Sequence, residues 1–349
     1  MIFDFRRHIT PILTVIAVVF SLTGCSSDAD TPESDAAVVR LAFFADGQAG
    51  TMRTLGSGNW SDVNSLAVAI YDDGGNTIGY RQNATPTADA SGIYTLDVET
   101  RQATGCSIYA SANVDCFSDG CTLNALKDKK ITRTALTDLA ADTEVPMVGV
   151  YGSTVDITGG SQTIGNVELK RICSLLSIRV TPASGITINS YQLCHLPKGT
   201  YYVERQPTDW TAPADYADFA AVSGLNSSSA VTASYFVYEN LAGSTAGLTA
   251  ETDRYAANAP TDASYLLVGA TGAGWQMVFR IYLGGLDLDG TTNYNNFNLY
   301  RNCRYTVDVQ VNGASDSDLR IDSRVESIGL TTTLGDWTSS GSDIPGTAE

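Results

Sequence analysis

Short runs of β-branched and aromatic residues, separated by clusters of Gly, Asn, Asp and Ser, recur along most of the chain. Runs of this kind predict β-strands, and the clusters between them predict turns. The clearest runs are VVRLAFFA (38–45), VNSLAVAIYD (63–72), GIYTLDVE (92–99), CSIYASANV (106–114), SLLSIRVTP (174–182), ASYFVYENL (233–241), YLLVGATG (265–272), WQMVFRIYLG (275–284) and RYTVDVQVNG (304–313). Regularly spaced antiparallel strands with few helices favour a mainly β fold built from β-sandwiches.

The chain has 349 residues, a length typical of about two domains. The composition breaks at TGGSQTIG (158–165), which marks a candidate boundary. We therefore predict one β-sandwich domain over residues 38–162 and a second over residues 163–349. One stretch, 122–142, departs from the strand pattern, because its Leu and Ala residues recur at spacings of three and four. This stretch predicts a few short helices over one sheet.

The N-terminus reads as an export signal. Arg6 and Arg7 precede an apolar stretch, Ile9–Leu22, that is too short to span about 30 Å of hydrocarbon as a helix. We predict a signal peptide over residues 1–24. The Leu-Thr-Gly-Cys sequence that ends at Cys25 resembles a bacterial lipobox, in which the cysteine is lipidated and becomes the mature N-terminus. The alternative is an ordinary secretory signal with a chance cysteine.

Charge narrows the range of partners. Residues 25–37 are too polar and acidic to bury a core, and they predict a solvated tether. The whole chain carries a formal net charge of −17. Nucleic acids and anionic lipid surfaces are bound by clustered Lys and Arg, so neither is an expected partner. Membrane attachment would instead depend on the lipid at Cys25.

The sequence has few candidates for catalytic or metal-binding residues, and we expect no enzyme activity, metal or cofactor. His8 lies in the signal, so His195 is the one histidine of the mature chain, which excludes HExxH zinc sites. A catalytic triad would need His195, whose setting favours a packing role. The loop 285–298 holds Asp287 and Asp289 and resembles a calcium loop, but it lacks the closing glutamate, so a long hairpin loop is favoured.

Six cysteines follow Cys25, and an even number in an exported chain permits disulfides. Cys106, Cys116 and Cys121 lie close together in the sequence, so one local bridge among them is plausible. Cys173 and Cys303 lie in apolar strand-like runs, where buried free thiols are an equal alternative.

Several segments together resemble a fimbrillin, the subunit family of the type V pili of Bacteroidales-type bacteria. A lipobox is followed by one strand, an arginine-bearing loop with Arg53, and a strand before a turn, VNSLAVAIYDDGGN. VELKRICSLLSIRV (167–180) resembles the segment that opens the second domain of the family. FNLYRNCRYTVDVQVNG (297–313) resembles the family's RN-x-x-Y motif before a strand.

The resemblance implies two β-sandwich domains with a transthyretin-like Greek-key topology. It implies a lipoprotein precursor that is carried to the outer membrane and cell surface. A maturation protease then cuts after an arginine, for which Arg53 is the candidate and Arg40, inside a strand run, is the rival. Removal of the first strand opens a groove that a strand of another pilus subunit fills, and the assembled fimbrium serves adhesion.

The C-terminal segment 324–337 is the candidate donor of that strand. One face of it is mainly apolar, and its residues alternate with small or polar ones, as a groove requires: Ile328, Leu330, Thr332 and Leu334. The alternative is that this segment forms the last strand of its own domain in the unassembled precursor.

Two other functions share some of these features. A glycan-binding surface lipoprotein of a polysaccharide-uptake system would show aromatic residues clustered on one exposed face. A hydrolase would need a deep cleft with two carboxylates about 5 to 9.5 Å apart. The sequence leaves open whether a pilus subunit of this kind is a stalk, anchor or tip.

Overall fold

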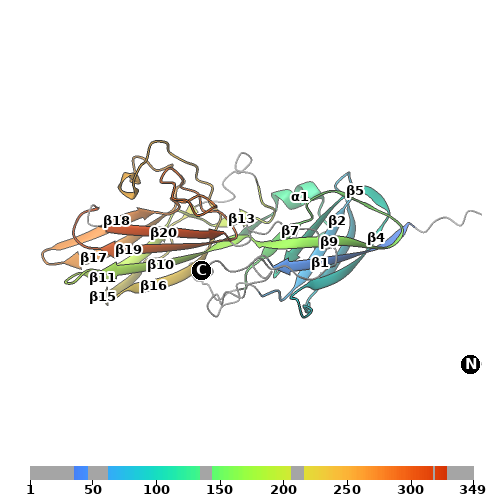
Figure 1. Cartoon of the computed structure of the whole chain (residues 1–349), viewed down its shortest axis with the longest axis horizontal. Coiled ribbons are helices and arrows are strands. Elements are labelled where there is room, and N and C mark those ends of the chain that lie inside the picture. Colours follow the sequence, from blue (N-terminus) through green and yellow to red (C-terminus); the bar gives the residue numbers. More distant parts are fainter. Residues whose placement is uncertain (1–34, 46–61, 134–143, 206–215, 317–318, 328–349) are drawn as a thin grey trace, which may run out of the picture. The chain divides into compact units, whose positions relative to one another are not determined.

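The computed structural model describes residues 35–45, 62–133, 144–205, 216–316 and 319–327 (Figure 1). These residues are mainly β, as predicted, with two short helical segments. No helix among the described residues is long and apolar enough to cross a membrane.

An eight-stranded sheet holds the N-terminal strands in the order β3-β2-β5-β7-β9-β1-β4, with β8 paired to β5. The two ends of this path lie side by side, because Thr100 Oγ1 on β4 donates to the carbonyl of Ile78 on β3 at 3.1 Å. The sheet thus curls around an aliphatic core. Its strands are β1 (Ala36–Ala45), β2 (Leu66–Tyr71), β3 (Thr77–Asn83), β4 (Tyr94–Arg101), β5 (Ala103–Ala112), β7 (Met147–Val150), β8 (Val155–Ile157) and β9 (Gly160–Arg171).

The boundary predicted between residues 162 and 163 falls inside β9. This strand pairs with β1 over most of its length and with β7 at Lys170 and Arg171, so it belongs to the first sheet throughout. Gly160 has a φ of 81° and makes the turn from β8 into β9, so the glycines that mark the composition break belong to a turn and not to a linker. Only Ile172 separates the first sheet from β10 (Cys173–Pro182).

The second half forms two four-stranded sheets, ordered β16-β10-β19-β20 and β15-β11-β17-β18, around one core. Both sheets contribute to this core, for example Leu176 of β10 and Phe279 of β18, neither of which is exposed. The pairs β10–β19 and, in the first sheet, β1–β9 are parallel. The remaining strands are β11 (Thr187–Cys194), β15 (Val222–Ser227), β16 (Val231–Tyr238), β17 (Tyr265–Gly272), β18 (Trp275–Tyr282), β19 (Cys303–Val311) and β20 (Leu319–Ser327).

Short elements link these sheets. A helix, α1 (Leu123–Asp128), confirms the prediction of helical structure after residue 122, and Thr122 caps it by accepting from the N–H of Ala125 at 3.4 Å. The rest of the predicted helical stretch, from residue 134, lies outside the described residues. Two ribbons and one 3₁₀ turn complete the set: β6 (Lys130–Thr132) with β13 (Gly199–Tyr201), β12 (Leu196–Pro197) with β14 (Tyr216–Ala217), and η2 (Glu251–Asp253).

All six cysteines in the described part of the chain are free thiols, so the local bridge considered from the sequence is wrong. Cys106 packs inside the first core, whereas Cys116 packs in a separate cluster with Cys121 at its margin. Cys173 and Cys303 also lie in different clusters, and both are buried. The alternative of buried free thiols is therefore confirmed for these two residues.

The loop 285–298 is held by amide side chains. Asp287 Oδ1 accepts from Asn293 Nδ2 and Asn296 Nδ2, each at 3.0 Å, and Asp289 accepts from the N–H of Thr291 at 2.8 Å. No group of three or more potential metal ligands occurs within the described ranges. Asp287 thus holds two amide side chains of this loop, and Asp289 holds its backbone at Thr291.

Candidate functional site

The first strand, β1, is hydrogen-bonded along both of its edges. It is antiparallel to β4, from Ala36 opposite Arg101 to Phe43 opposite Tyr94, and parallel to β9 on the other side (Figure 1). It therefore joins β4 to the rest of the sheet. Its loss would leave two rows of unpaired backbone groups, which form a ready template for another strand.

One face of β1 fills the first core. The side chains on this face are at most 3% exposed and alternate along the strand: Ala37, Val39, Leu41 and Phe43. The opposite face is solvated, and Arg40 there makes a two-bond pair with Asp97 on β4 at 2.7 and 2.8 Å. The bonds from Arg40 lower the pKa of Asp97. The side chains of β1 thus alternate between a buried and a more exposed face, with the period of two of a β-strand.

The neighbours of β1 form the walls of a slot. Each apolar side chain that β1 buries there contributes roughly 1.5 to 3 kcal/mol. If β1 left, an apolar trough would face water between two unpaired edges, and only another strand in the same register would satisfy both. The walls are lined by Leu96 and Val98 of β4 and by Ile164, Val167 and Leu169 of β9, all buried.

The last described strand, β20, is bound differently. Among the described strands it pairs only with β19, from Leu319 opposite Val311 to Ser327 opposite Cys303, and it forms the edge of its sheet. Leu319 and Ile321 pack against the second core but stay partly exposed. Its removal would therefore break one ladder and expose less apolar surface than the removal of β1.

A buried arginine and an asparagine connect the two halves. Arg171, the last residue of β9, has no exposed surface. Its backbone N–H and its Nη1 donate to Oδ1 of Asn302 at 3.2 and 3.1 Å. Asn302 has a φ of 55°, a left-handed conformation that Asn tolerates better than most residues, and its N–H donates to the carbonyl of Cys173 at 2.9 Å. The turn before β19 thus holds the end of the first sheet.

The neighbouring residue, Arg301, is fixed at the same place. It donates to Oε2 of Glu239 at 2.8 and 3.1 Å, to Thr200 Oγ1 at 3.1 Å and to the carbonyl of Tyr202 at 3.3 Å. A buried charge needs such a set of partners to be tolerated. The hydroxyl of Tyr305 accepts from the backbone N–H of Tyr300 at 2.8 Å. The residues of the RN-x-x-Y motif are therefore structural.

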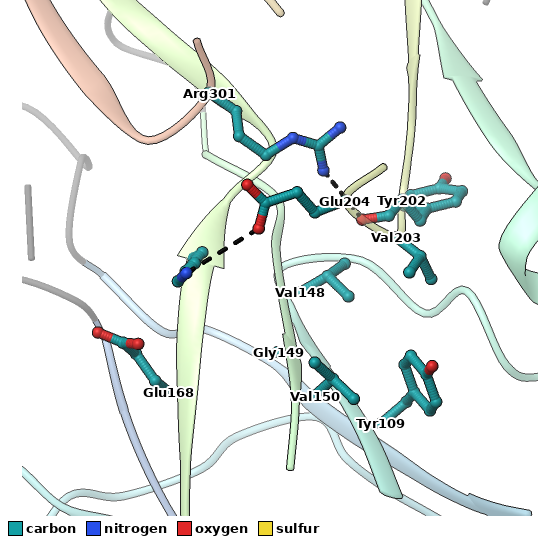
Figure 2. A pocket seen from close by; sticks show the side chains of 10 residues that line it. Tyr109, Val148, Gly149, Val150, Glu168, Tyr202, Val203, Glu204 and Arg301 are labelled. Atoms are coloured by element: carbon teal, nitrogen blue, oxygen red, sulfur yellow. Dashed lines mark hydrogen bonds and ion pairs between the residues drawn. The ribbon is translucent and has the colours of Figure 1, made fainter. Parts of the chain in front are cut away.

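A cavity of about 270 Å³ opens beside this junction (Figure 2). Tyr109, Val148 and Val150 of the first sheet line one side, and the stretch Tyr202–Glu204 lines the other. Figure 2 shows Arg301 at its upper edge, tied to the carbonyl of Tyr202. Apolar side chains thus share the lining of this cavity with four charged ones, those of Glu168, Lys170, Glu204 and Arg301.

The predicted site residues lie outside the described part of the chain. These are the lipidation residue Cys25, the cleavage residue Arg53 and the donor residues Ile328, Leu330, Thr332 and Leu334. The rival arginine, Arg40, lies inside β1 with ladder partners on both sides. A strand paired in this way is poorly accessible to a protease.

The link between Arg171 and Asn302 did not emerge from the sequence. Both residues stood in segments that resemble the family, but the two segments are 131 positions apart, and nothing local pairs them. The one sequence signal was the charge itself, because an arginine within the apolar run before β10 needs a buried partner.

The surroundings of two ionisable residues bear on the catalytic alternatives: His195, whose Nε2 lies 3.8 Å from Oδ1 of Asp262, and Glu251. The ring of His195 stacks on Tyr216 at 4.3 Å, and Ser264 Oγ donates to the backbone carbonyl of His195 and not to its ring. Burial raises the pKa of Glu251 to about 7, with the coulombic effect of Arg254 opposing. The space beside Glu251 is only about 70 Å³, far smaller than a sugar site requires.

The glycan-binding alternative required aromatic residues gathered on one exposed face. Within the described ranges, the two exposed aromatic side chains are Tyr80 and Tyr255. Tyr80 lies on β3 of the first sheet, and Tyr255 follows η2 in the second half. They form no cluster.

Comparison with known proteins gives two family matches, each over part of the chain. Residues 37–171, which end at the last residue of β9, match the family described as "Major fimbrial subunit protein (FimA)", and residues 235–309 match a domain of unknown function, DUF4906. No curated protein sequence matches the chain.

Solved structures share the fold at low sequence identity. A putative cell adhesion protein from Parabacteroides distasonis has a TM-score of 0.60 and 17% identity over 86% of this chain and 100% of its own. The tip fimbrial protein Mfa3 from Porphyromonas gingivalis has a TM-score of 0.56 and 12% identity over 84% and 99%. A fimbrilin, FimA, from Porphyromonas gingivalis W83 has a TM-score of 0.55 and 13% identity over 86% and 99%.

Proposed function

We propose that this chain, a fimbrillin-family protein, is a subunit of a surface fimbrium that is exported as a lipoprotein and polymerises by strand exchange. The observation that carries the proposal is the position of β1. The strand nearest the N-terminus is paired on both edges, and its apolar face is fully buried. Cutting the chain after it would make a core strand removable.

Export and cutting would follow in sequence. Lipidation at Cys25 carries the precursor to the outer membrane, and a protease then cuts after Arg53. Arg53 stands in a Gly- and Ser-rich stretch between β1 and β2, whereas Arg40 is shielded in the ladder. After the cut, β1 is held only by non-covalent contacts, so a competing strand can replace it.

The competing strand would come from the C-terminal segment of another subunit. Ile328, Leu330, Thr332 and Leu334 alternate with small or polar residues. The inward face of β1 has the same period of two. The two segments could therefore occupy one slot in turn, and the fimbrium so formed would serve adhesion as a stalk or tip.

Replacement of the processing arginine tests this function. In cells that express wild-type protein, surface fibres should begin at Thr54, whereas an Arg53→Ala chain should keep residues 25–53 and form no fibres. Arg81→Ala, at an exposed position of β3, serves as the matched control and should behave as wild type. N-terminal sequencing and electron microscopy give the readouts. Normal fibres from Arg53→Ala would contradict cleavage at this residue.

A further inference from the structure

The strand β18 has one edge without a strand partner in the described part of the chain. It ends the sheet β15-β11-β17-β18 and pairs with β17, from Trp275 opposite Gly272 to Tyr282 opposite Tyr265 (Figure 1). The backbone N–H and C=O groups along a free edge can form hydrogen bonds with a strand of another chain. The surroundings of this edge decide where such a strand can add.

Other residues lie beside the C-terminal part of β18. Arg254 is only 4% exposed, and its Nη2 donates to the carbonyl of Leu283, directly after the strand, at 2.8 Å. Arg280 of β18 lines a small cavity together with Glu251 of η2 and with residues of β20. This arrangement leaves the N-terminal part of the strand for a partner.

The N-terminal part of β18, residues 275–278, has the sequence WQMV and carries no charge. Gln276 is exposed, Met277 is 37% exposed and Val278 is 61% exposed. Successive side chains of a strand point to opposite faces, so apolar side chains flank this edge on both faces of the sheet. Proteins commonly protect free edges with charges, prolines or bulges. This stretch has neither a charge nor a proline, and its register with β17 is unbroken.

The edge strand of the other four-stranded sheet, β20, has the protection that β18 lacks. Charged residues occupy every second position of most of its length: Arg320, Asp322, Arg324 and Glu326. Charges placed along an edge strand disfavour the addition of a further strand. The two edges therefore differ, and the uncharged stretch of β18 is the more suitable one for pairing.

The stretch 274–278 is complementary to itself. When two copies pair antiparallel with Gln276 opposite Gln276, Trp275 of each copy lies opposite Met277 of the other, so two sulfur–aromatic contacts form. The ring of Trp275 already lies directly over Gly272, where a Cβ would collide with it. A ring held in this way loses little conformational freedom when a partner binds.

This register also keeps the covered part of β18 clear of the second copy. Arg280 of one copy would be level with Gly272 of the other, which lies past the turn of the β17–β18 hairpin. The chain carries a formal net charge of −17, so two copies repel each other over most of their surfaces. β18 contains no acidic residue, and a contact through it avoids that repulsion locally.

We propose that the N-terminal part of β18 binds the same stretch of a second copy of this chain, by antiparallel strand pairing centred on Gln276. The contact has two-fold symmetry, because the same residues are used on both sides. In a fimbrium every subunit would carry one such edge, so contacts that are weak singly would add up between neighbouring fibres. The inference goes beyond the proposed function and needs neither cleavage nor a donor strand.

Disulfide trapping in the full, uncut chain tests the pairing and its register. Gln276→Cys places a thiol opposite the same thiol of the second copy, within disulfide distance. Val278→Cys is the matched control, because in this register it lies opposite Gly274 and the two thiols are roughly 13 Å apart along the strands. Both are made in a background in which Cys25 and Cys121 are Ser, because the described thiols other than Cys121 are buried.

After mild oxidation, Gln276→Cys should give at least fivefold more disulfide-linked dimer than Val278→Cys. Chance collisions would favour the opposite order or none, because Val278 is 61% exposed on the same strand. Equal yields, or a higher yield from Val278→Cys, would therefore overturn the proposal.

Sedimentation equilibrium in the same background measures the association without a crosslink. Val278→Lys should raise the dissociation constant of the dimer at least tenfold, because it places a charge beside the added strand. Val150→Lys is the control, the same change at an exposed valine of β7, which has partners on both edges, and it should leave the constant unchanged. Raising the salt concentration from about 0.05 to 0.5 M should strengthen the dimer, because salt screens the repulsion between the two acidic chains.

A parent chain that remains monomeric at about 0.1 mM would overturn the proposal and leave this edge to an extended segment of another protein. Equal dissociation constants for Val278→Lys and the parent chain would also overturn it. Since all these measurements use the uncut chain, their failure would leave strand exchange in polymers untouched.

Discussion

The first and last described strands are held in opposite ways. β1 has a partner on each edge and an inward face that is almost completely buried, whereas β20 has one partner and an inward face that is only partly buried. β20 alternates apolar with polar residues at its start, whereas β1 is apolar at every position except Arg40. The difference lies in the position of each strand in its sheet.

This difference separates two roles. A strand between two others can be lost only if something replaces it, because both neighbours would be left unpaired and the core would open. An edge strand can leave with the loss of the backbone hydrogen bonds to one neighbouring strand. Under the proposed exchange, β1 is therefore the strand that must be replaced, and the proposed donor residues 328–334 follow the edge strand β20 in the sequence.

The largest expected effect compares core positions in the two strands. Phe43→Ala on β1 should lower the free energy of unfolding of the uncut chain by about 3 to 5 kcal/mol, because a fully buried ring leaves a cavity. Ile321→Ala on β20, where the side chain is partly exposed, should cost less than half as much. Urea unfolding followed by tryptophan fluorescence measures both. Equal losses of unfolding free energy in the two variants would contradict the difference drawn between β1 and β20.

The junction should give the next largest effect. Asn302→Ala removes the acceptor for the buried Arg171 and places a less tolerant residue at a left-handed φ, so it should cost about 2 to 3 kcal/mol in urea unfolding. Asn302→Gly keeps the conformation and removes only the bonds. Asn226→Ala, at an exposed position of β15 with a left-handed φ, is the control for the backbone alone. A loss from Asn302→Ala no larger than that from Asn226→Ala would show that the bonds to Arg171 contribute little.

The smallest expected effect is a dependence of the free energy of unfolding on pH, which arises from Glu251 near β20. Glu251 lies in the cavity that Leu319 and Ile321 of β20 also line, and burial raises its pKa from 4.5 to about 7. The folded chain then holds this proton more tightly than the unfolded chain does. Stability from this group is therefore full below about pH 4.5 and is lost as the pH rises to about 7.

Glu251→Gln should remove that loss, which is about 1 to 3 kcal/mol. The test is urea unfolding of wild type and variant at pH 5 and pH 8, with Asp316→Asn at the same cavity as the control. A wild-type pH slope that is unchanged in Glu251→Gln would exclude Glu251 as its source.

The sequence predicted the elements better than their limits and contacts. Runs of β-branched and aromatic residues identified nine strands, β1, β2, β4, β5, β10 and β16–β19, because this signal is local. The domain boundary predicted at residue 163 was wrong, because a glycine such as Gly160 occurs in turns as well as in linkers. The bonds between Arg171 and Asn302, and the two-sided pairing of β1, depend on contacts between distant segments, which no local pattern contains.

The most direct test asks whether the slot of β1 receives the C-terminal segment of another chain. One population carries Val167→Cys in the slot wall, and a second carries Ile328→Cys, Leu330→Cys or Leu334→Cys, all in a Cys25→Ser background. The populations are mixed before and after cleavage by an arginine-specific protease, and interchain disulfides are mapped by mass spectrometry. We predict a bridge to at least one donor position after cleavage and none before it or in Arg53→Ala chains. Fibres that form after cleavage without any such bridge would contradict the account.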